Sequence, residues 1–232
     1  MVYLSEEVMA VINVAMDGPV GAGKSSVARE AAKRLGFIYV DTGALYRSCG
    51  LYCCRNDIDI IHENDELIGS ILNEKVKLEI RLVNGVQHVI LNGEDVSEEI
   101  RLPEISMAAS AVSALPSVRR YLLDTQRKVA AENNVIMDGR DIGTVILPNA
   151  QVKIFITAKA EIRAKRRYNE LAAKGVETTF EEVLSDLNTR DYNDSHRKEA
   201  PLKQADDAIL LDTSELSFEE AVESLIRLVK DR

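Results

Sequence analysis

The sequence predicts an α/β protein built on a five-stranded parallel sheet flanked by helices. Five short apolar runs are separated by segments of helical periodicity, which is the pattern of successive β-α-β units. A glycine-rich stretch, Gly18–Ser26 (GPVGAGKSS), joins the first apolar run to the first helical segment. A strictly alternating run with Asn-Gly turns interrupts this order in the first half of the chain. It predicts a three-stranded antiparallel insertion in an otherwise parallel fold.

The expected elements follow one another along the chain. Strands are expected at Val11–Met16, Phe37–Val40, Asn134–Met137, Val152–Ile156 and Ala208–Leu211. Helices are expected at Val27–Leu35, from Thr42 or Gly43 to Arg55, within Ile58–Asn73, and at Ser97–Ala114, Pro116–Asn133 and Glu161–Lys174. Two capping boxes, Thr179–Glu182 and Ser217–Glu220, predict the starts of two more helices. The periodicity of these last two helices predicts buried faces made by Phe180, Val183, Leu184 and Leu187, and by Phe218, Val222, Leu225 and Val229.

The insertion begins at Lys75–Asn84, where apolar and charged residues alternate as in a strand with one buried face. Asn84-Gly85 is a strong hairpin signal, and Val86–Leu91 forms the returning strand. A second turn, Asn92-Gly93, leads into Glu94–Ser97. A meander of this size buries little apolar surface alone, so we expect it to pack on neighbouring helices as an acceptor-binding subdomain.

The bulk composition excludes several classes of protein. The chain has 232 residues and a net charge of −9, which argues against a general binder of nucleic acid or anionic membranes. No apolar run approaches the roughly 20 residues needed to cross a bilayer, and residues 1–10 lack the features of a signal peptide. Cys49, Cys53 and Cys54 lack metal-binding spacing and are expected to be small buried side chains in a reducing compartment. The sequence therefore predicts a cytoplasmic protein.

The stretch Gly18–Ser26 has the residue types that a phosphate-binding loop requires. Glycines let the backbone wrap so that its N–H groups point at phosphate oxygens, and the positive end of the following helix strengthens the field. Lys24 places a charge beside the β- and γ-phosphates, and the Ser25 hydroxyl is a ligand for Mg²⁺. Both the preceding strand and the following helix are present, so the loop predicts a bound nucleoside triphosphate. Its contacts are expected from Gly18, Pro19, Val20, Gly21, Ala22, Gly23, Lys24, Ser25 and Ser26.

Charged residues gather at the predicted strand ends and on two helix faces. Asp41 and Asp138 each end a strand, and they are candidates to order the water shell of the metal. Arg47 and Gly139-Arg140-Asp141 follow the same strand ends. Two further sets lie at helical spacing: Arg163, Arg166 and Arg167, and Arg190, Asp194 and Arg197. So many arginines in an acidic protein indicate two phosphate-bearing substrates, because the guanidinium fork binds phosphate oxygens in pairs.

At these motifs the chain resembles bacterial cytidylate (CMP) kinases of the nucleoside monophosphate kinase family. The resemblance rests on GPVGAGKSS, DTGALYR, LNGEDVSEEIR, the AAS…PSVR segment, MDGRDIGT, VKIFITA…RAKRR and RDYNDSHRKEAPL, in this order from about Val11 to the C-terminus. It implies a P-loop kinase fold as a single unit over 11–232. The implied parts are a core (11–41, 115–157 and 205–232), a CMP-binding region with the β insertion (42–114), and a lid with flanking helices (158–204).

The resemblance also implies roles for individual residues. Arg47, Arg140 and Arg197 match the arginines that hold the acceptor phosphate, and Ser110, Arg119 and Asp141 match the residues that recognise cytosine. Arg190 and Asp194 match the pair at the ribose hydroxyls, and Thr42 and Tyr46 lie beside the base site. The residues expected to act on the transferring phosphoryl group are Lys24, Asp41, Arg140, Arg163 and Arg167.

The implied reaction is phosphoryl transfer from ATP-Mg²⁺ to CMP or dCMP by a monomer that binds neither nucleic acid nor membrane. The acceptor is already an anionic oxygen, so no general base is expected, and catalysis would come from positioning and charge neutralisation. Two alternatives stay open. One is another small-acceptor kinase, such as an adenylate or shikimate kinase. The other is a nucleotide-dependent switch, although the guanine-reading NKxD motif of such proteins is missing from the sequence.

Overall fold

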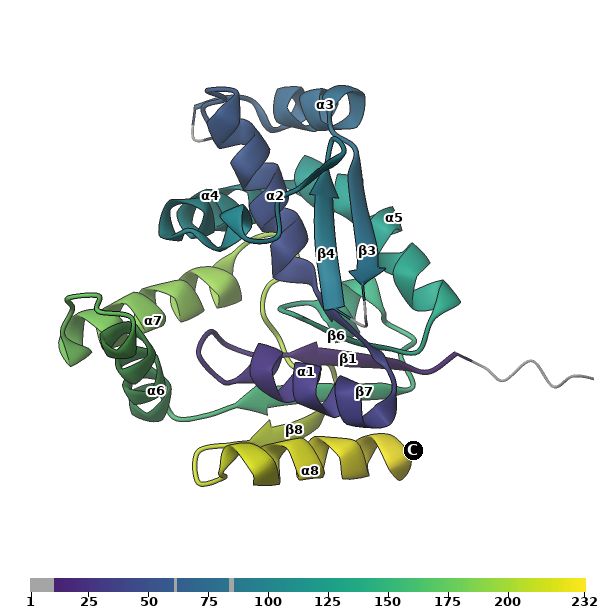
Figure 1. The fold of residues 1–232 in the computed structure, drawn as a ribbon, viewed down its shortest axis with the longest axis vertical. Helices are drawn as coiled ribbons and strands as arrows, with labels where there is room; N and C mark the ends of the chain where they lie inside the picture. The colour runs from purple at the N-terminus through teal and green to yellow at the C-terminus, as the bar shows by residue number, and fades with distance from the viewer. Residues whose placement is uncertain (1–10, 61, 84–85) are drawn as a thin grey trace, which may run out of the picture.

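The computed structural model describes residues 11–60, 62–83 and 86–232, and it contains the expected five-stranded parallel sheet (Figure 1). The strand order is β2-β6-β1-β7-β8. The strands are β1 (Asn13–Asp17), β2 (Ile38–Asp41), β6 (Val135–Gly139), β7 (Val152–Thr157) and β8 (Ile209–Asp212). Every neighbouring pair runs parallel, so all five carboxyl ends meet at one edge of the sheet.

Helices cover both faces of this sheet. α1 (Lys24–Leu35) and α8 (Phe218–Lys230) pack together on one face, and α5 (Pro116–Glu132) lies on the other with η2 (Ile142–Ile146), a single turn of π-helix. Side chains of β1 alternate between the two layers: Val14 and Met16 face α1 and α8, whereas Ala15 faces the α5 side. The central strands β1 and β6 are buried on both faces, which explains why they are continuous apolar runs rather than alternating ones, whereas the edge strand β8 is largely exposed.

Residues 42–113, which include the three-stranded insertion, form a second body above the sheet in Figure 1. It comprises α2 (Thr42–Arg55), α3 (Asp65–Lys75), β3 (Leu78–Val83), β4 (Val86–Leu91), β5 (Glu94–Asp95), η1 (Glu99–Arg101) and α4 (Pro103–Ser113). The three strands pair antiparallel in the order β3-β4-β5. Leu45, Cys49, Leu72, Val89 and Leu122 share one buried cluster, so the meander packs on its neighbouring helices as expected. The expected Asn84-Gly85 turn lies outside the described residues.

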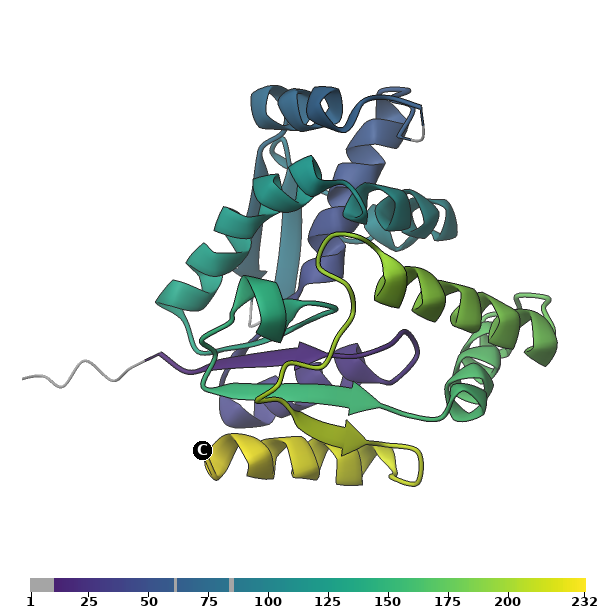
Figure 2. The same ribbon diagram turned by 180° about the vertical axis from the view of Figure 1, so that it is seen from behind.

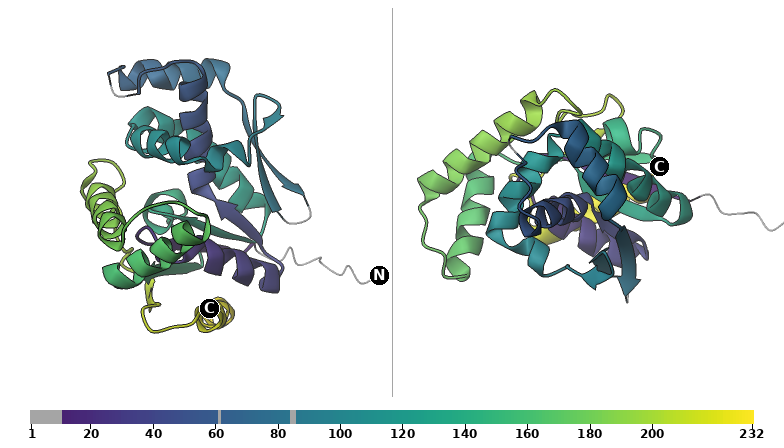
Figure 3. Two further views of the ribbon diagram at one scale, coloured as in Figure 1. Left: turned by 60° about the vertical axis from the view of Figure 1, so that its left-hand side comes forward. Right: turned by 90° about the horizontal axis from the view of Figure 1, so that it is seen from above.

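Two helices, α6 (Ala160–Ala173) and α7 (Phe180–His196), project to one side of the sheet (Figures 1 and 3). Ala164, Val183 and Leu187 form a small apolar core between them. The chain then returns from α7 to β8 along the back of the molecule (Figure 2). Residues 158–159 join β7 to α6, whereas the longer segment 197–208 joins α7 to β8.

Three sequence-based expectations need correction. Phe218 is 52 % exposed, because it lies in the first turn of α8 and the apolar cluster beneath that helix is filled by Leu216 instead. Cys54 is exposed, whereas Cys49 and Cys53 are buried as expected. The expected helix Ser97–Ala114 is divided into η1 and α4, because the residue before Pro103 is held in an extended conformation.

The other elements agree with the expectations to within a few residues. Both capping boxes are present, at Thr179–Glu182 and Ser217–Glu220, with side-chain and backbone bonds in both directions. Within the described residues, no helix has the length and apolar character needed to cross a membrane.

Gly18 provides a first test of the fold, because the backbone of β7 leaves no space beside it. A Cβ at Gly18 would lie 2.0 Å from the Ile156 carbonyl oxygen. We therefore expect Gly18→Ala to lower the free energy of unfolding by about 2–3 kcal/mol, measured by urea denaturation. The matched control is Gly36→Ala, at φ 70° with nothing near its Cβ position, which should cost only about 1 kcal/mol. Equal losses in both variants would contradict the close approach.

Candidate active site

The phosphate-binding loop turns from β1 into α1 at the carboxyl edge of the sheet. Gly21 and Gly23 have φ values of 75° and 84°, which only glycine adopts without strain. Lys24 is buried, and its Nζ donates to the Pro19 carbonyl oxygen at 2.7 Å. Burial, together with the nearby charge of Arg140, lowers the pKa of Lys24. A bound phosphate would raise the pKa of Lys24 again, because a nearby negative charge stabilises the ammonium group. The electrostatics of the loop therefore favour binding of an anion.

Ser25 and Asp138 lie together beside the loop. The Ser25 hydroxyl donates to Asp138 Oδ2 at 2.8 Å, and the Tyr39 hydroxyl donates to Oδ1 at 3.2 Å. Burial and the nearby Asp41 raise the pKa of Asp138. The donor set of a hydroxyl and a carboxylate fits Mg²⁺, which prefers oxygen ligands and usually keeps several waters in addition to one or two protein groups. The structure therefore brings one of the two strand-end acids, Asp138, to the predicted metal ligand, whereas Asp41 pairs with Arg47.

Asp17 is a site residue that the sequence reasoning missed. Its carboxylate accepts from the backbone N–H groups of Ile142 at 2.7 Å and Gly143 at 2.8 Å, and the side chain is only 4 % exposed. It thus connects the start of the phosphate loop to the segment that follows Asp141. The available signal was an acid at the end of an apolar strand, directly before Gly18.

The ionisation of Asp17 gives a second test. Burial raises its pKa to about 6, so the folded state binds this proton more tightly than the unfolded state does. Stability from this group is therefore greatest at low pH and is lost as the pH rises through about 6. Relative to Asp17→Asn, we expect the wild-type free energy of unfolding to fall by about 1.4 kcal/mol between about pH 5 and about pH 8. Denaturant titrations of both proteins at each pH measure the free energy of unfolding of the wild type minus that of Asp17→Asn. An increase of this value with pH would contradict the prediction.

A buried ion cluster lies across the site from the phosphate loop. Asp141 is 3 % exposed and contacts the guanidinium groups of Arg119 and of Arg197, the latter at 3.4 Å. The Arg119 guanidinium also lies 5.6 Å from the centre of the Tyr46 ring. Burial raises the pKa of Asp141 and lowers that of Arg197, with their mutual attraction opposing both shifts. Four of the predicted acceptor residues are therefore in one place.

Two more predicted arginines pair with carboxylates at the same edge. Arg47 Nη2 lies 2.7 Å from Asp41 Oδ2, and Arg140 Nε lies 2.6 Å from Asp194 Oδ2. Among the described residues, the buried Nε of Arg47 has no hydrogen-bond partner. A buried guanidinium N–H without an acceptor indicates room for an anion, because leaving such a donor unpaired costs free energy. The hydroxyl of Thr42 is already used, since it donates to the Asp138 carbonyl oxygen at 2.8 Å.

Ser110 and Arg190 lie on facing helices rather than in the buried cluster. Both are exposed, and both line a cleft of about 450 Å³ between α4 and α7. Asp194, one turn beyond Arg190, pairs with Arg140 in this structure. Arg119 of the buried cluster also donates to the Ser113 carbonyl oxygen at 3.3 Å, which joins the cluster to the C-terminal end of α4.

The arginines of α6 differ in their surroundings although they were expected to share one face. Arg163 is buried and donates to the carbonyl oxygens of Ala158 at 2.9 Å and Val20 at 2.8 Å. Its Nη2 also lies 2.7 Å from Asp191 Oδ2. Arg167 is exposed and pairs only with Glu170 among the described contacts, at 3.1 Å. Arg163 therefore joins the phosphate loop to α6 and α7, whereas Arg167 is available to a ligand.

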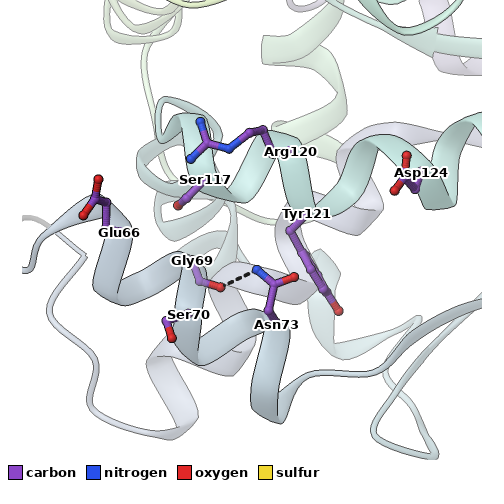
Figure 4. A pocket seen from close by; sticks show the side chains of 8 residues that line it. All are labelled: Glu66, Gly69, Ser70, Asn73, Ser117, Arg120, Tyr121 and Asp124. Atoms are coloured by element: carbon purple, nitrogen blue, oxygen red, sulfur yellow. Dashed lines mark hydrogen bonds between the residues drawn. The ribbon is translucent and has the colours of Figure 1, made fainter.

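A second groove, of about 390 Å³, lies between α3 and α5 (Figure 4). Figure 4 shows Glu66 and Asn73 of α3 facing Arg120 and Asp124 of α5. None of the predicted site residues lines it. This groove therefore lies apart from the candidate site at the carboxyl edge of the sheet.

The fold and the site together define a P-loop kinase, since a glycine-rich phosphate loop and several arginine–carboxylate pairs lie at the carboxyl edge of a parallel sheet. A family model described as cytidylate kinase matches residues 14–231. The chain belongs to the cytidylate kinase family. It is 48 % identical to the cytidylate kinase of Caldicellulosiruptor bescii, over 95 % of this chain and 96 % of that one. It is 50 % identical to that of Thermosipho melanesiensis, over 94 % and 97 %.

A solved structure shares the overall fold. It is an uncharacterized protein from Eubacterium ventriosum, which superposes with a TM-score of 0.54 and covers 95 % of this chain and 99 % of its own. The two sequences are 14 % identical, so the likeness concerns the fold alone.

Proposed function

We propose that this chain transfers the γ-phosphoryl group of ATP to CMP or dCMP, forming ADP and CDP or dCDP. The observation that carries the proposal is Asp141, buried between Arg119 and Arg197 opposite the phosphate loop. Cytosine presents one exocyclic amine as a donor and a ring nitrogen and a carbonyl as acceptors. A carboxylate beside an arginine offers the complementary acceptor and donors, and buried polar groups of this kind discriminate strongly against a base that leaves them unpaired.

On the donor side, the loop backbone and Lys24 would hold the triphosphate. Ser25 and Asp138 would hold Mg²⁺, which offsets charge on the β- and γ-phosphate oxygens. Lys24 would exchange its bond to Pro19 for phosphate oxygens and regain full charge there. The role of these groups is to orient the γ-phosphoryl group and to stabilise the charge that develops during transfer.

On the acceptor side, Arg47, Arg140 and Arg197 would bind the monophosphate. Each now pairs with a carboxylate, so acceptor binding would exchange an internal anion for a ligand anion at each arginine. The acceptor oxygen attacks as an anion, and no side chain is required to remove a proton. The segment 42–114 would form the acceptor-binding region, and 158–204 the lid that excludes water from ATP when both substrates are bound. Arg167 would exchange its exposed pairing with Glu170 for the transferring phosphoryl group on closure.

An ADP-release assay with CMP, dCMP, UMP and AMP tests this proposal, with a sample lacking any acceptor as the control. We expect ADP formation that depends on CMP or dCMP and is much slower with AMP. Turnover that is highest with AMP would favour an adenylate kinase. ATP hydrolysis that no monophosphate stimulates would overturn the kinase reaction itself.

We further propose that the enzyme acts as a monomer in the cytoplasm and binds no nucleic acid. The buried, free thiols of Cys49 and Cys53 suit a reducing compartment. The net charge of −9 disfavours nucleic acid as a partner. Light scattering after gel filtration tests the monomer, which requires a mass near 25.7 kDa.

A further inference from the structure

Gln87 lies where the insertion meets the open edge of the five-stranded sheet. Among the strands that the structure describes, β2 is the outermost on this side, so no described strand pairs with its outward backbone groups. At its last residue, the Asp41 backbone N–H donates to Gln87 Oε1 at 2.8 Å, and Gln87 Nε2 donates to the Asp41 carbonyl oxygen at 3.2 Å. The side-chain amide of Gln87 therefore pairs with Asp41 as a neighbouring strand would. In Figure 1 the lower end of β4, which carries Gln87, reaches down to the sheet.

Asp41 in turn determines where Arg47 lies. Its Oδ1 accepts from the Ala44 backbone N–H at 3.2 Å and caps α2, while its Oδ2 lies 2.7 Å from Arg47 Nη2. Gly43 packs tightly against both groups, since a Cβ there would be 3.1 Å from Asp41 Oδ1 and 3.1 Å from Arg47 Nη1. A shift of the Asp41 backbone would therefore be transmitted to the Arg47 guanidinium.

We propose that Gln87 is a positioning residue through which the three-stranded insertion sets Arg47 for the acceptor phosphate. The inference rests on the proposed function, because it takes Arg47 as a phosphate ligand. Only an amide supplies both the acceptor and the donor that Asp41 requires, and asparagine is one methylene too short to keep this reach. Both hydrogen bonds of the Gln87 amide go to the Asp41 backbone, so its effect on the acceptor would pass through Asp41 and Arg47.

The neighbouring residue His88 provides a matched control. Its Nδ1 lies 2.7 Å from Asp95 Oδ2 within the insertion, and successive side chains of a strand point to opposite faces. His88→Ala thus removes a polar contact from the same strand without touching Asp41.

Steady-state kinetics of Gln87→Leu, Gln87→Glu and His88→Ala test the inference. Leucine removes both hydrogen bonds to Asp41. Glutamate can still accept from the Asp41 N–H, but its second carboxylate oxygen would face the Asp41 carbonyl oxygen and repel it. We expect both Gln87 variants to raise KM for CMP about tenfold while KM for ATP changes less than about twofold. His88→Ala should leave both constants unchanged. Thermal unfolding of each variant reports any general loss of structure.

The same measurements in an Arg47→Ala background test the route of the effect. If Gln87 acts through Arg47, Gln87→Leu should have little further effect on kcat/KM for CMP when Arg47 is already absent. Unchanged KM values for CMP, equal rises for CMP and ATP, or full additivity with Arg47→Ala would each overturn the inference. A wild-type enzyme with no CMP-dependent ADP formation would overturn the proposed function instead, so the two failures are distinguishable.

Discussion

Lys24→Met is expected to lower kcat for CMP phosphorylation about a thousandfold, the loss typical of removing one charged donor from a preorganised site. Methionine keeps most of the length of the side chain and its burial but removes the ammonium group. In the structure that group is buried and bonded to Pro19, and its pKa is lowered by burial, so a bound phosphate would stabilise its charge. We expect the ammonium group to act mainly in the transition state, where it would stabilise the negative charge on the oxygens of the transferring phosphoryl group.

The comparison for this prediction is Lys33→Met. Lys33 is exposed in the last turn of the same helix, so it shares the helix but not the loop. Coupled ADP-release kinetics at saturating ATP and CMP measure kcat for both variants. A loss of less than about tenfold in Lys24→Met would contradict a role in stabilising transferred charge, and unchanged unfolding midpoints would exclude a folding defect.

Asp141→Asn should raise KM for CMP by about a hundredfold or more and leave ATP binding unaffected. The substitution keeps the shape of the side chain and removes its charge. Arg119 and Arg197 would then face one another in a buried site without their shared anion. The cytosine amine would also lose an acceptor. Since breaking a buried ion pair is costly, we expect a fall of about 3 kcal/mol in the free energy of unfolding as well.

Asp124→Asn serves as the control for Asp141, because Asp124 is exposed on α5 and lines the groove between α3 and α5. Kinetics with varied CMP and displacement of a fluorescent ATP analogue separate the two substrates. Equal losses of CMP use and ATP binding would remove Asp141 from base recognition. Denaturant titration shows how much of any change comes from the fold.

The phosphate loop was predictable from nine consecutive residues. Both capping boxes were predictable from four consecutive residues each, Thr179–Glu182 and Ser217–Glu220. In each case the determining interactions lie within a few residues along the chain: glycine at positive φ, a helix N-terminus, and Ser or Thr paired with a glutamate three residues later. The five strands were predictable for a related reason, since each is short, apolar and followed by a helical pattern.

The residues assigned from family resemblance could be located only with the structure. It brings Asp141, Arg119 and Arg197 together, but it places Ser110 and Arg190 in an exposed cleft between α4 and α7. Helical spacing also suggested one shared face for Arg163 and Arg167, whereas one is buried and the other exposed. Spacing along a helix predicts which side chains share a face of that helix, but it does not predict which other part of the protein packs against each of them.

By itself, the sequence determined the phosphate loop, the order of strands and helices along the chain, and the presence of an antiparallel insertion. The tertiary structure alone decided that Asp17 would accept from Ile142, that Arg140 would pair with Asp194, and that Gln87 would complete the edge of β2. Asp17 and Ile142 are 125 positions apart, and Gln87 and Asp41 are 46 apart. Asp17 meets Ile142 because the strand order β2-β6-β1-β7-β8 places the ends of β1 and β6 side by side, and Gln87 reaches Asp41 because β4 of the separate antiparallel sheet packs against the end of β2. Both arrangements follow from packing the whole chain rather than from any local preference.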